Sequence, residues 1–224
     1  MREVPVSQLR LGNFADSAPW RRVRSVHGQP HHSGSYASAT TGGHVVYESR
    51  LELAWLLLAD SDPAVVGIFA QPCRLTARIG DRMRRHVPDF LLVMRSGTAR
   101  VVNVKPADRL QDPKIAEALA WPGALVEQHG WEYEVWSGAD RVLLENVRFL
   151  AAYRRPGVVP EAAVERAWAE VADGEQLAVT ERRLAGDRPA HEARPALMAL
   201  LWSGRLRADL SRPLSGESVL WRHA

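Results

Sequence analysis

The chain has a single cysteine, Cys73, among its 224 residues. One thiol excludes an intramolecular disulfide framework and a zinc cluster built from cysteines, and it suits a reducing compartment. The sequence also lacks any run of about 18 apolar residues, and its start, MREVPVSQLRLGNF, contains no apolar segment typical of a secretion signal. We therefore expect neither membrane insertion nor secretion, and we predict a cytoplasmic protein.

Lysine is almost absent, because the sequence has only two lysines against 27 arginines. The formal net charge is +3 although the isoelectric point is near 9.4, so any surface that binds nucleic acid must be local. Lys105 ends the apolar run VVNVK. A cation at the end of such a run is costly unless it has a partner or a function, which makes Lys105 a candidate site residue.

Composition and periodicity predict three parts of the chain. Residues 1–44 are rich in Gly, Ser, His and Arg, which predicts a basic, partly disordered arm; its segment WRRVR at 20–24 is either a contact for a DNA backbone or a plain tail. Residues 45–150 mix helical and strand patterns, which indicates an α/β domain. Residues 151–224 show three helical stretches and then two short strand-like runs, the order of a winged helix.

Within the α/β part, the stretch ESRLELAWLLLAD predicts a helix that begins with a capping box of Ser49 and Glu52. Short β-branched and aromatic runs follow and predict an antiparallel meander. The segment KIAEALAWPGALVEQHG predicts a second helix with an interruption at Pro122, and WEYEVWSG predicts a further strand.

A tight turn centred on the SG of RSGT would place Asp89 opposite Val104, between Asn103 and Lys105. Because side chains alternate along a strand, Asn103 and Lys105 share one face. One interpretation of this group is a cross-strand ion pair, worth about 0.2–1 kcal/mol. The other is a metal-dependent phosphodiesterase, in which a carboxylate holds a divalent cation and an ammonium orients water or stabilises charge on the phosphate.

Glu52 is a second carboxylate for such a site. It either only completes the capping box or also reaches the end of the sheet, because its helix must pack on that sheet. Four segments in this order then resemble the PD-(D/E)xK nucleases, and more narrowly the TnsA family, the endonuclease subunit of heteromeric transposases. They are SRLEL at 49–53, IFAQP at 68–72, VPDFL at 87–91 and VNVKP at 102–106, within a resemblance that covers about residues 45–140.

The resemblance implies a restriction-endonuclease-like core, a mixed central sheet flanked by helices, followed by a small winged-helix domain. It also implies that Glu52, Asp89 and Lys105 are catalytic, and that Mg²⁺ or Mn²⁺ is held by Asp89, Asn103 and Glu52. Glu48 is the rival helix glutamate. Position 103 is acidic in most of these nucleases and glutamine in TnsA; asparagine offers a carbonyl oxygen but no charge, so weaker metal binding and a catalytically silent relative both stay open.

Candidate DNA contacts precede Asp89. Arg82, Arg84 and Arg85 lie in what the sequence predicts to be a turn, where they either bind phosphate or form solvated surface. Gln71 matches a glutamine that often precedes the family's central motif, and it either contacts the site or ends a strand.

The sequence and the resemblance together predict a Mg²⁺-dependent DNA endonuclease that cleaves strands at transposon ends. DNA is the expected partner, and the resemblance alone implies a transposase subunit and an ATPase regulator; a homodimer and the number of metal ions are left open. A stand-alone restriction, defence or repair nuclease would share every site residue. A silent DNA-binding or regulatory module is the non-enzymatic alternative.

Overall fold

The structure is a computed structural model that describes residues 4–14, 19–20, 32–186 and 193–223. The chain divides into two compact units, the first formed by Met1–Ala59 and Ala64–Gly138 and the second by Asp60–Pro63 and Ala139–Ala224. The sequence predicted the division after residue 150. It lies earlier because helix α3 (Arg141–Leu150), which was not among the predicted elements, packs with the helices of the second unit.

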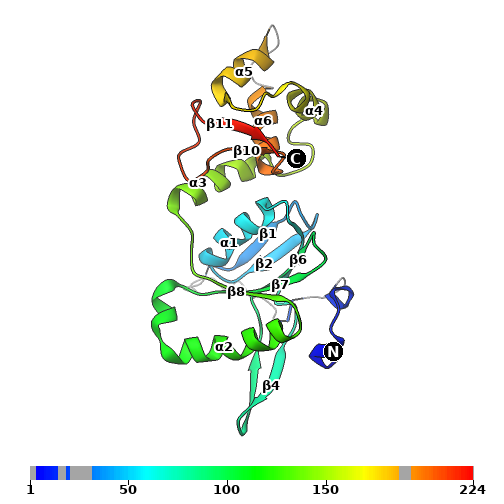
Figure 1. Cartoon of the computed structure of the whole chain (residues 1–224), viewed down its shortest axis with the longest axis vertical. Helices are drawn as coiled ribbons and strands as arrows, with labels where there is room; N and C mark the ends of the chain where they lie inside the picture. Colours follow the sequence, from blue (N-terminus) through cyan, green and yellow to red (C-terminus); the bar gives the residue numbers. More distant parts are fainter. Residues whose placement is uncertain (1–3, 15–18, 21–31, 187–192, 224) are drawn as a thin grey trace. The chain divides into compact units, whose positions relative to one another are not determined.

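The first unit is built on a four-stranded sheet with the order β3-β6-β7-β8. Figure 1 labels β6, β7 and β8 of this sheet. Strands β3 and β6 and strands β6 and β7 are antiparallel, whereas β7 and β8 are parallel, so the sheet is mixed. The strands span Val65–Ala70 (β3), Phe90–Met94 (β6), Ala99–Val104 (β7) and Glu132–Trp136 (β8). This α/β arrangement is consistent with the restriction-endonuclease-like core that was expected. The meander was predicted correctly as antiparallel up to β7, after which helix α2 carries the chain back and allows a parallel strand.

Helices cover both faces of this sheet. Helix α1 (Arg50–Ser61) lies on one face, where Trp55 stacks on Phe90 of β6 with 4.6 Å between the ring centroids. On the other face, Leu91 and Val101 join Val126 of helix α2 (Pro113–Gln128) in one buried apolar cluster. Neighbouring residues of β6 thus point to opposite helices, as the alternation of side chains along a strand requires.

Helix α2 continues through Pro122, so the predicted interruption at this residue is wrong. Gly123 follows it, and a Cβ placed there would lie 2.9 Å from a ring carbon of Tyr133 on β8. Proline and glycine inside a helix cost about 3 and 1 kcal/mol relative to alanine. The close approach of Tyr133 explains why the glycine is nevertheless required.

The turn between β6 and β7 differs from the predicted one by a single residue. Met94 and Thr98 close a three-residue loop, in which Gly97 adopts a positive φ of 87°. A two-residue turn centred on Ser96 and Gly97 needs a positive φ at Ser96, which Ser96 does not adopt, whereas the three-residue loop needs one only at Gly97. The ladder therefore pairs Phe90 with Val102, one residue away from the predicted register.

The segment expected to be a turn before Asp89 is instead a strand. Strands β4 (Leu75–Ile79) and β5 (Arg82–His86) form a separate two-stranded antiparallel ribbon between β3 and β6 in the chain. Gly80, with a φ of 58°, and Asp81 connect the two strands. Figure 1 shows this ribbon extending beyond α2. The three arginines of the expected turn, Arg82, Arg84 and Arg85, thus lie on β5, where they pair with Ile79, Ala77 and Thr76 of β4.

Part of the predicted N-terminal arm is ordered in the described residues. Phe14 is buried in the apolar cluster with Leu91 and Val101. Within the described ranges, four short elements precede α1: η1 (Val6–Gln8), η2 (Leu11–Phe14), β1 (Gly34–Ala37) and β2 (His44–Tyr47). Of the basic segment at 20–24, only Trp20 is described, and residues 21–24 lie outside the described part.

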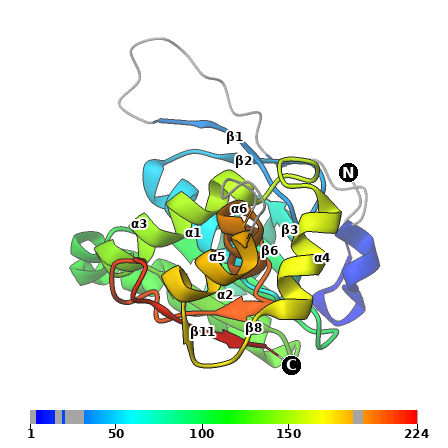
Figure 2. The same ribbon diagram turned by 90° about the horizontal axis from the view of Figure 1, so that it is seen from above.

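The second unit contains the three helices that the sequence predicted, together with α3. Helix α6 lies between α3 and α4, with α5 beside it (Figure 2). A three-stranded sheet of order β10-β11-β9 completes the unit. The elements are η4 (Ala151–Tyr153), α4 (Glu161–Glu170), β9 (Glu175–Gln176), α5 (Leu177–Ala185), α6 (Ala193–Trp202), β10 (Leu206–Arg207) and β11 (Val219–Arg222). No helix within the described ranges is long and apolar enough to cross a bilayer.

Candidate active site

Asp89 lies directly before β6, where the β4-β5 ribbon joins the sheet. Its Oδ2 accepts a hydrogen bond of 2.7 Å from the backbone N–H of Val104 and one of 3.4 Å from the ammonium of Lys105. No described residue donates a hydrogen bond to its Oδ1. One carboxylate oxygen is thus anchored to β7, while the other remains available for a ligand.

The observed register explains why Asp89 meets Lys105. Extending the β6-β7 ladder by one residue places Asp89 opposite Asn103, not opposite Val104 as predicted. Directly opposed residues project on the same face of a sheet, and Asn103 and Lys105 share a face by alternation. Asn103 lies on the α2 face of β7, and Asp89 and Lys105 lie just beyond the ends of β6 and β7, where their side chains meet. The cross-strand ion pair, one of the two interpretations from the sequence, is present.

Asn103 is fully buried, with an exposed fraction of 0%, and belongs to a chain of hydrogen bonds. His86 Nε2 donates to its Oδ1 at 2.7 Å, and its Nδ2 donates to the hydroxyl of Tyr133 at 2.9 Å. The Tyr133 hydroxyl in turn donates to the carbonyl oxygen of Leu119 on α2, also at 2.9 Å. Both ends of the Asn103 amide therefore have protein partners.

Sequence reasoning missed Tyr133 as part of this site. Burial first, and then the nearby Asp89 carboxylate, raises the pKa of Tyr133. In the sequence Tyr133 is simply one aromatic residue in a strand-like run, WEYEVW. Only the parallel pairing of β7 with β8, in which Asn103 lies opposite Val135, brings its hydroxyl to Asn103.

The substitution Asn103→Asp is expected to lower the free energy of unfolding by about 1–3 kcal/mol at neutral pH without divalent metal. A carboxylate can still accept from His86, but it cannot donate to Tyr133, so the phenol must choose between the new carboxylate and Leu119. Urea unfolding measures the difference, with Asn13→Asp at an exposed position as the control. An Asn103→Asp protein as stable as the parent would contradict the hydrogen-bond chain.

Glu52 forms the predicted capping box of α1. Its Oε2 accepts from the Glu48 N–H at 2.7 Å, its Oε1 accepts from the Ser49 hydroxyl at 3.0 Å, and its own N–H donates to Ser49 Oγ at 3.1 Å. Burial raises the pKa of Glu52, and the Asp89 carboxylate raises it further. Glu52 is therefore both a helix cap and within electrostatic range of Asp89. Glu48, the rival glutamate, contacts it through its backbone.

Gln71 holds the backbone of Asp89. Its N–H donates to the Asp89 carbonyl at 2.8 Å, and its own carbonyl accepts from the Trp20 N–H at 3.0 Å. Among the described residues other than glycine, it alone has a positive φ, of 46°. Its exposed fraction is only 6%, so a direct contact with DNA stays a prediction. Strain of this kind persists only where the surroundings enforce it, and it is common at functional sites.

The three predicted DNA-binding arginines have different surroundings. The guanidinium of Arg84 pairs with Glu117 on α2 at 2.5 Å, which fixes the ribbon to the helix. Arg82 and Arg85 are exposed on the ribbon. The structure thus places Asp89 in contact with Lys105 at the sheet end, with Glu52 within electrostatic range of Asp89. Arg82 and Arg85 lie on the adjoining ribbon.

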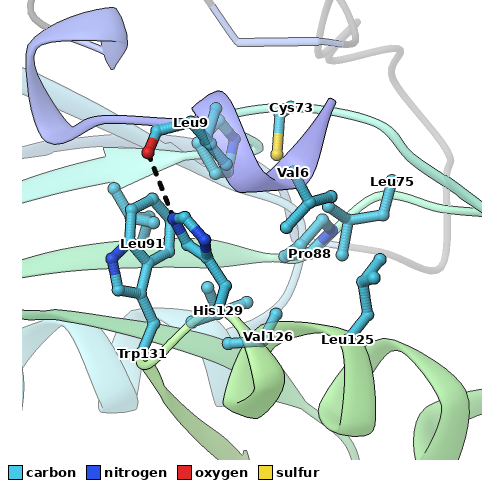
Figure 3. A pocket seen from close by; sticks show the side chains of 12 residues that line it. Val6, Leu9, Cys73, Leu75, Pro88, Leu91, Leu125, Val126, His129 and Trp131 are labelled. Carbon is cyan, nitrogen blue, oxygen red and sulfur yellow. Dashed lines mark hydrogen bonds between the residues drawn. The ribbon is translucent and has the colours of Figure 1, made fainter. Parts of the chain in front are cut away.

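A small apolar pocket lies on the same face of the sheet (Figure 3). Its volume of about 10 Å³ admits no more than about one water molecule. His129 Nε2 donates to the carbonyl oxygen of Leu9 at 3.1 Å and so holds the N-terminal segment over it. Burial raises the pKa of the Cys73 thiol in its wall to about 11, which keeps the thiol protonated at neutral pH. The pocket is part of the packing and not a substrate site.

The donor set at the sheet end is small. In the described ranges, no three side chains of His, Cys, Asp or Glu gather as metal ligands. Asp89 contacts the Lys105 ammonium, Glu52 lies within electrostatic range of Asp89, and Asn103 precedes Lys105 by two residues. Hard cations such as Mg²⁺ accept oxygen ligands, often only one or two carboxylates, and keep several waters. The residues present therefore fit such an ion.

Comparison with known families bears on the same part of the chain. Residues 62–138 match the family model of the TnsA-like endonuclease N terminal. This confirms the predicted resemblance for the segment from just before β3 to just after β8, and it supports a nuclease, for which DNA is the implied substrate. No curated protein matches the chain.

Proposed function

Starting from this match to TnsA-like endonucleases, we propose that the first unit is a metal-dependent endonuclease that hydrolyses phosphodiester bonds of DNA. The observation that carries the proposal is the carboxylate of Asp89, which has one anchored oxygen and one open oxygen beside the ammonium of Lys105. Glu52 lies within electrostatic range of the same carboxylate. If Asp89 and Lys105 formed only a structural ion pair, the fold would not require Glu52 as a second, partly desolvated carboxylate within range of Asp89.

Mg²⁺ or Mn²⁺ would be held by Asp89 through its open oxygen and by Glu52, with the amide oxygen of Asn103 as a third donor. When bound, such an ion lowers the pKa of a coordinated water and offsets charge on the phosphate. The Val104 N–H and the Gln71 N–H keep Asp89 in position through its side chain and its backbone.

Lys105 has a separate role in this proposal. Its ammonium has three donors and makes one hydrogen bond to Asp89, a long one of 3.4 Å, so it can also face a phosphate oxygen. Its backbone N–H donates to the Trp136 carbonyl at 2.9 Å, which fixes the main chain at the end of β7. A compact ammonium in this position stabilises the charge that develops on the phosphate in the transition state.

We extend the proposal to the second unit, which we assign as a winged helix. Its order α4-β9-α5-α6-β10-β11 and its antiparallel sheet, with β11 in the middle, support the assignment. Most of α6 is buried, including Leu197, Met198 and Leu201. A helix that is apolar nearly all round has little surface for reading bases, so we propose a protein-binding role for this unit.

By resemblance to TnsA, we propose that cleavage takes place at transposon ends, beside a transposase subunit and with an ATPase regulator. A cytoplasmic location accompanies this proposal. The alternative of a stand-alone restriction, defence or repair nuclease uses the same site residues. Cleavage of plain DNA by the isolated protein would favour that alternative, whereas dependence on partners would favour the transposition role.

Nicking of supercoiled plasmid tests the proposal. The purified chain should convert supercoiled plasmid to the open-circular or linear form with Mg²⁺ or Mn²⁺, and not with EDTA. Variants with Asp89→Ala or Lys105→Ala should lose this activity. Equal nicking by all three proteins would show that a contaminant or another site is responsible.

One observation favours the second candidate, a silent DNA-binding module. Asn103 is neutral, and both ends of its amide are already bonded within the protein. A protein that binds duplex DNA but never nicks it, with either metal and with partner subunits present, would support this candidate over the nuclease.

Glu52→Gln is expected to reduce cleavage at least about 100-fold without destabilising the fold at neutral pH. Glutamine can complete a capping box, so the helix start is kept. Burial raises the folded-state pKa of Glu52, so the fold favours the protonated carboxyl group over the charged one. The stability that this preference contributes is fully present below the ordinary pKa of 4.5 and is lost as pH rises. The thermal midpoint of Glu52→Gln should therefore equal or exceed that of the parent at pH 7, and the difference should narrow toward pH 4.5.

Glu48→Gln is the matched control for this experiment, because Glu48 is the neighbouring glutamate. It should keep most of the cleavage activity. If Glu48→Gln abolished cleavage and Glu52→Gln did not, Glu48 would be the helix glutamate of the site. Differential scanning calorimetry and plasmid nicking on the same samples provide both measurements.

A further inference from the structure

The β4-β5 ribbon carries positive charge that the fold does not use. Arg78, Arg82 and Arg85 are exposed on it, and none of their side chains makes a hydrogen bond or an ion pair with any residue in the described part of the chain. Arg84, by contrast, is held by Glu117. The one acidic residue of the ribbon is Asp81 in its turn. Free guanidinium groups on a projecting element indicate an anionic partner.

These charges lie on both faces of the ribbon. The ladder pairs Arg78 with Met83 and Ile79 with Arg82, and directly paired residues share a face. Arg78 and Arg85 therefore project on one face, and Arg82 projects on the other. A ribbon that lies between two rows of anionic groups needs cations on both faces. A ribbon that lies on a flat anionic surface needs cations on one face only.

The end of the ribbon is also apolar. Met83 is 57% exposed and Ile79 is 40% exposed, one on each face. Large apolar side chains at the end of a solvated hairpin add nothing to the core of the first unit. They are suited to apolar contact with a partner, such as the methyl group of thymine on the floor of the major groove.

From these observations we infer that the β4-β5 ribbon inserts into the major groove of the DNA that the site cleaves. The major groove, about 12 Å wide, admits a two-stranded β-ribbon, and its two phosphate backbones supply negative charge on both sides. The exposed arginines would face the backbones, and Met83 and Ile79 would reach the base edges. The inference rests on the proposed action on DNA and names how that DNA is held.

Because the ribbon begins next to Asp89, its length determines how far the groove contact lies from the cleaved phosphate. Strand β5 leads through Val87 and Pro88 into Asp89, and His86 at its base is bonded to Asn103. At about 3.3 Å per residue, the ribbon end lies roughly 15 Å from that base. This length corresponds to about four or five base-pair steps of about 3.4 Å. The contact should therefore lie within about half a helical turn of the scissile phosphate.

The charge contacts are tested by binding a labelled 30-base-pair duplex in EDTA, where no cleavage takes place. The triple variant Arg78→Gln, Arg82→Gln, Arg85→Gln should raise Kd at least about tenfold near 0.1 M salt. It should also lower the slope of log K against log salt by about 2–3, because each phosphate contact contributes about 0.9. The control carries the same charge change at Arg141, Arg148 and Arg212 of the second unit, and its slope should change by less than about one.

The groove is tested separately. Met83→Ser should weaken binding several-fold without changing the salt slope, and methyl green, a major-groove ligand, should compete with the protein more strongly than netropsin, a minor-groove ligand. An unchanged Kd for the triple variant would overturn the inference and would leave a protein as the partner of the ribbon. Stronger competition by netropsin would overturn the choice of groove.

These outcomes are distinguishable from those for cleavage. If the ribbon variants lose affinity in EDTA while the parent never nicks DNA, the ribbon contact holds and the nuclease proposal fails. If the triple variant binds and nicks like the parent, the nuclease proposal holds and the ribbon inference fails. Circular dichroism of each variant shows that the exposed substitutions leave the fold intact.

Discussion

Asp89→Asn is expected to lower the rate of Mg²⁺-dependent strand cleavage at least about 1,000-fold. Asparagine has nearly the same shape, and its carbonyl oxygen can still accept the hydrogen bond from the Val104 N–H. It loses the negative charge that would hold the cation and that attracts the ammonium of Lys105. The loss should therefore come from the chemistry of the site and not from the fold.

Single-turnover cleavage of an end-labelled duplex, with protein in excess, measures this loss directly. Duplex binding in EDTA should be unchanged or tighter, because a carboxylate that repels phosphate has been removed. Asp108→Asn, at an exposed position of η3 (Ala107–Gln111), is the matched control and should cleave like the parent. A cleavage rate within about threefold of the parent would remove Asp89 from the site.

The second large effect is expected at Lys105. Lys105→Ala should lower the cleavage rate about 100- to 1,000-fold, the usual cost of removing one group that stabilises transition-state charge. Lys105→Arg should restore only part of the rate, because the planar guanidinium cannot occupy the place of a compact ammonium beside Asp89. The effect should fall on the rate of the bound complex more than on the concentration of DNA needed for half saturation.

The chain supplies its own control for this experiment, since Lys114 is its other lysine and lies exposed at the start of α2. Lys114→Ala should retain the parental rate. Full activity of Lys105→Arg would indicate that any cation at this position suffices. Full activity of Lys105→Ala would mean that the contact with Asp89 is only a structural ion pair.

Much of the first unit was predictable because its apolar patterns are local. Helix α1, with its capping box at Ser49 and Glu52, and strand β8 lie where the sequence placed them. The grouping of Asp89 with Lys105 was also predicted, since both flank strands that pair as neighbours. These features depend on residues close together in sequence, where periodicity and turn signals are strongest.

The register at the site could not be read from the turn residues alone. The sequence RSGT allows both a two-residue and a three-residue loop, and the choice depends on whether Ser96 adopts a positive φ, which it does not in the folded chain. Helix α3 was missed although its signals are local: Asp140 caps its start, and Val147 and Leu150 lie on one buried side of it. The role of Tyr133 depends on a parallel pairing that no local pattern specifies.

At Pro122 and Gly123, helix α2 and strand β8 are so close that a change in one of them requires a change in the other. The ring of Tyr133 occupies the volume that a side chain at 123 would fill, and its hydroxyl joins Leu119 to Asn103. Replacing both residues by alanines, a common way to strengthen a helix, would push this ring and disturb the amide next to Lys105. Thermostabilising this protein therefore has to begin elsewhere, or has to exchange positions 123 and 133 together.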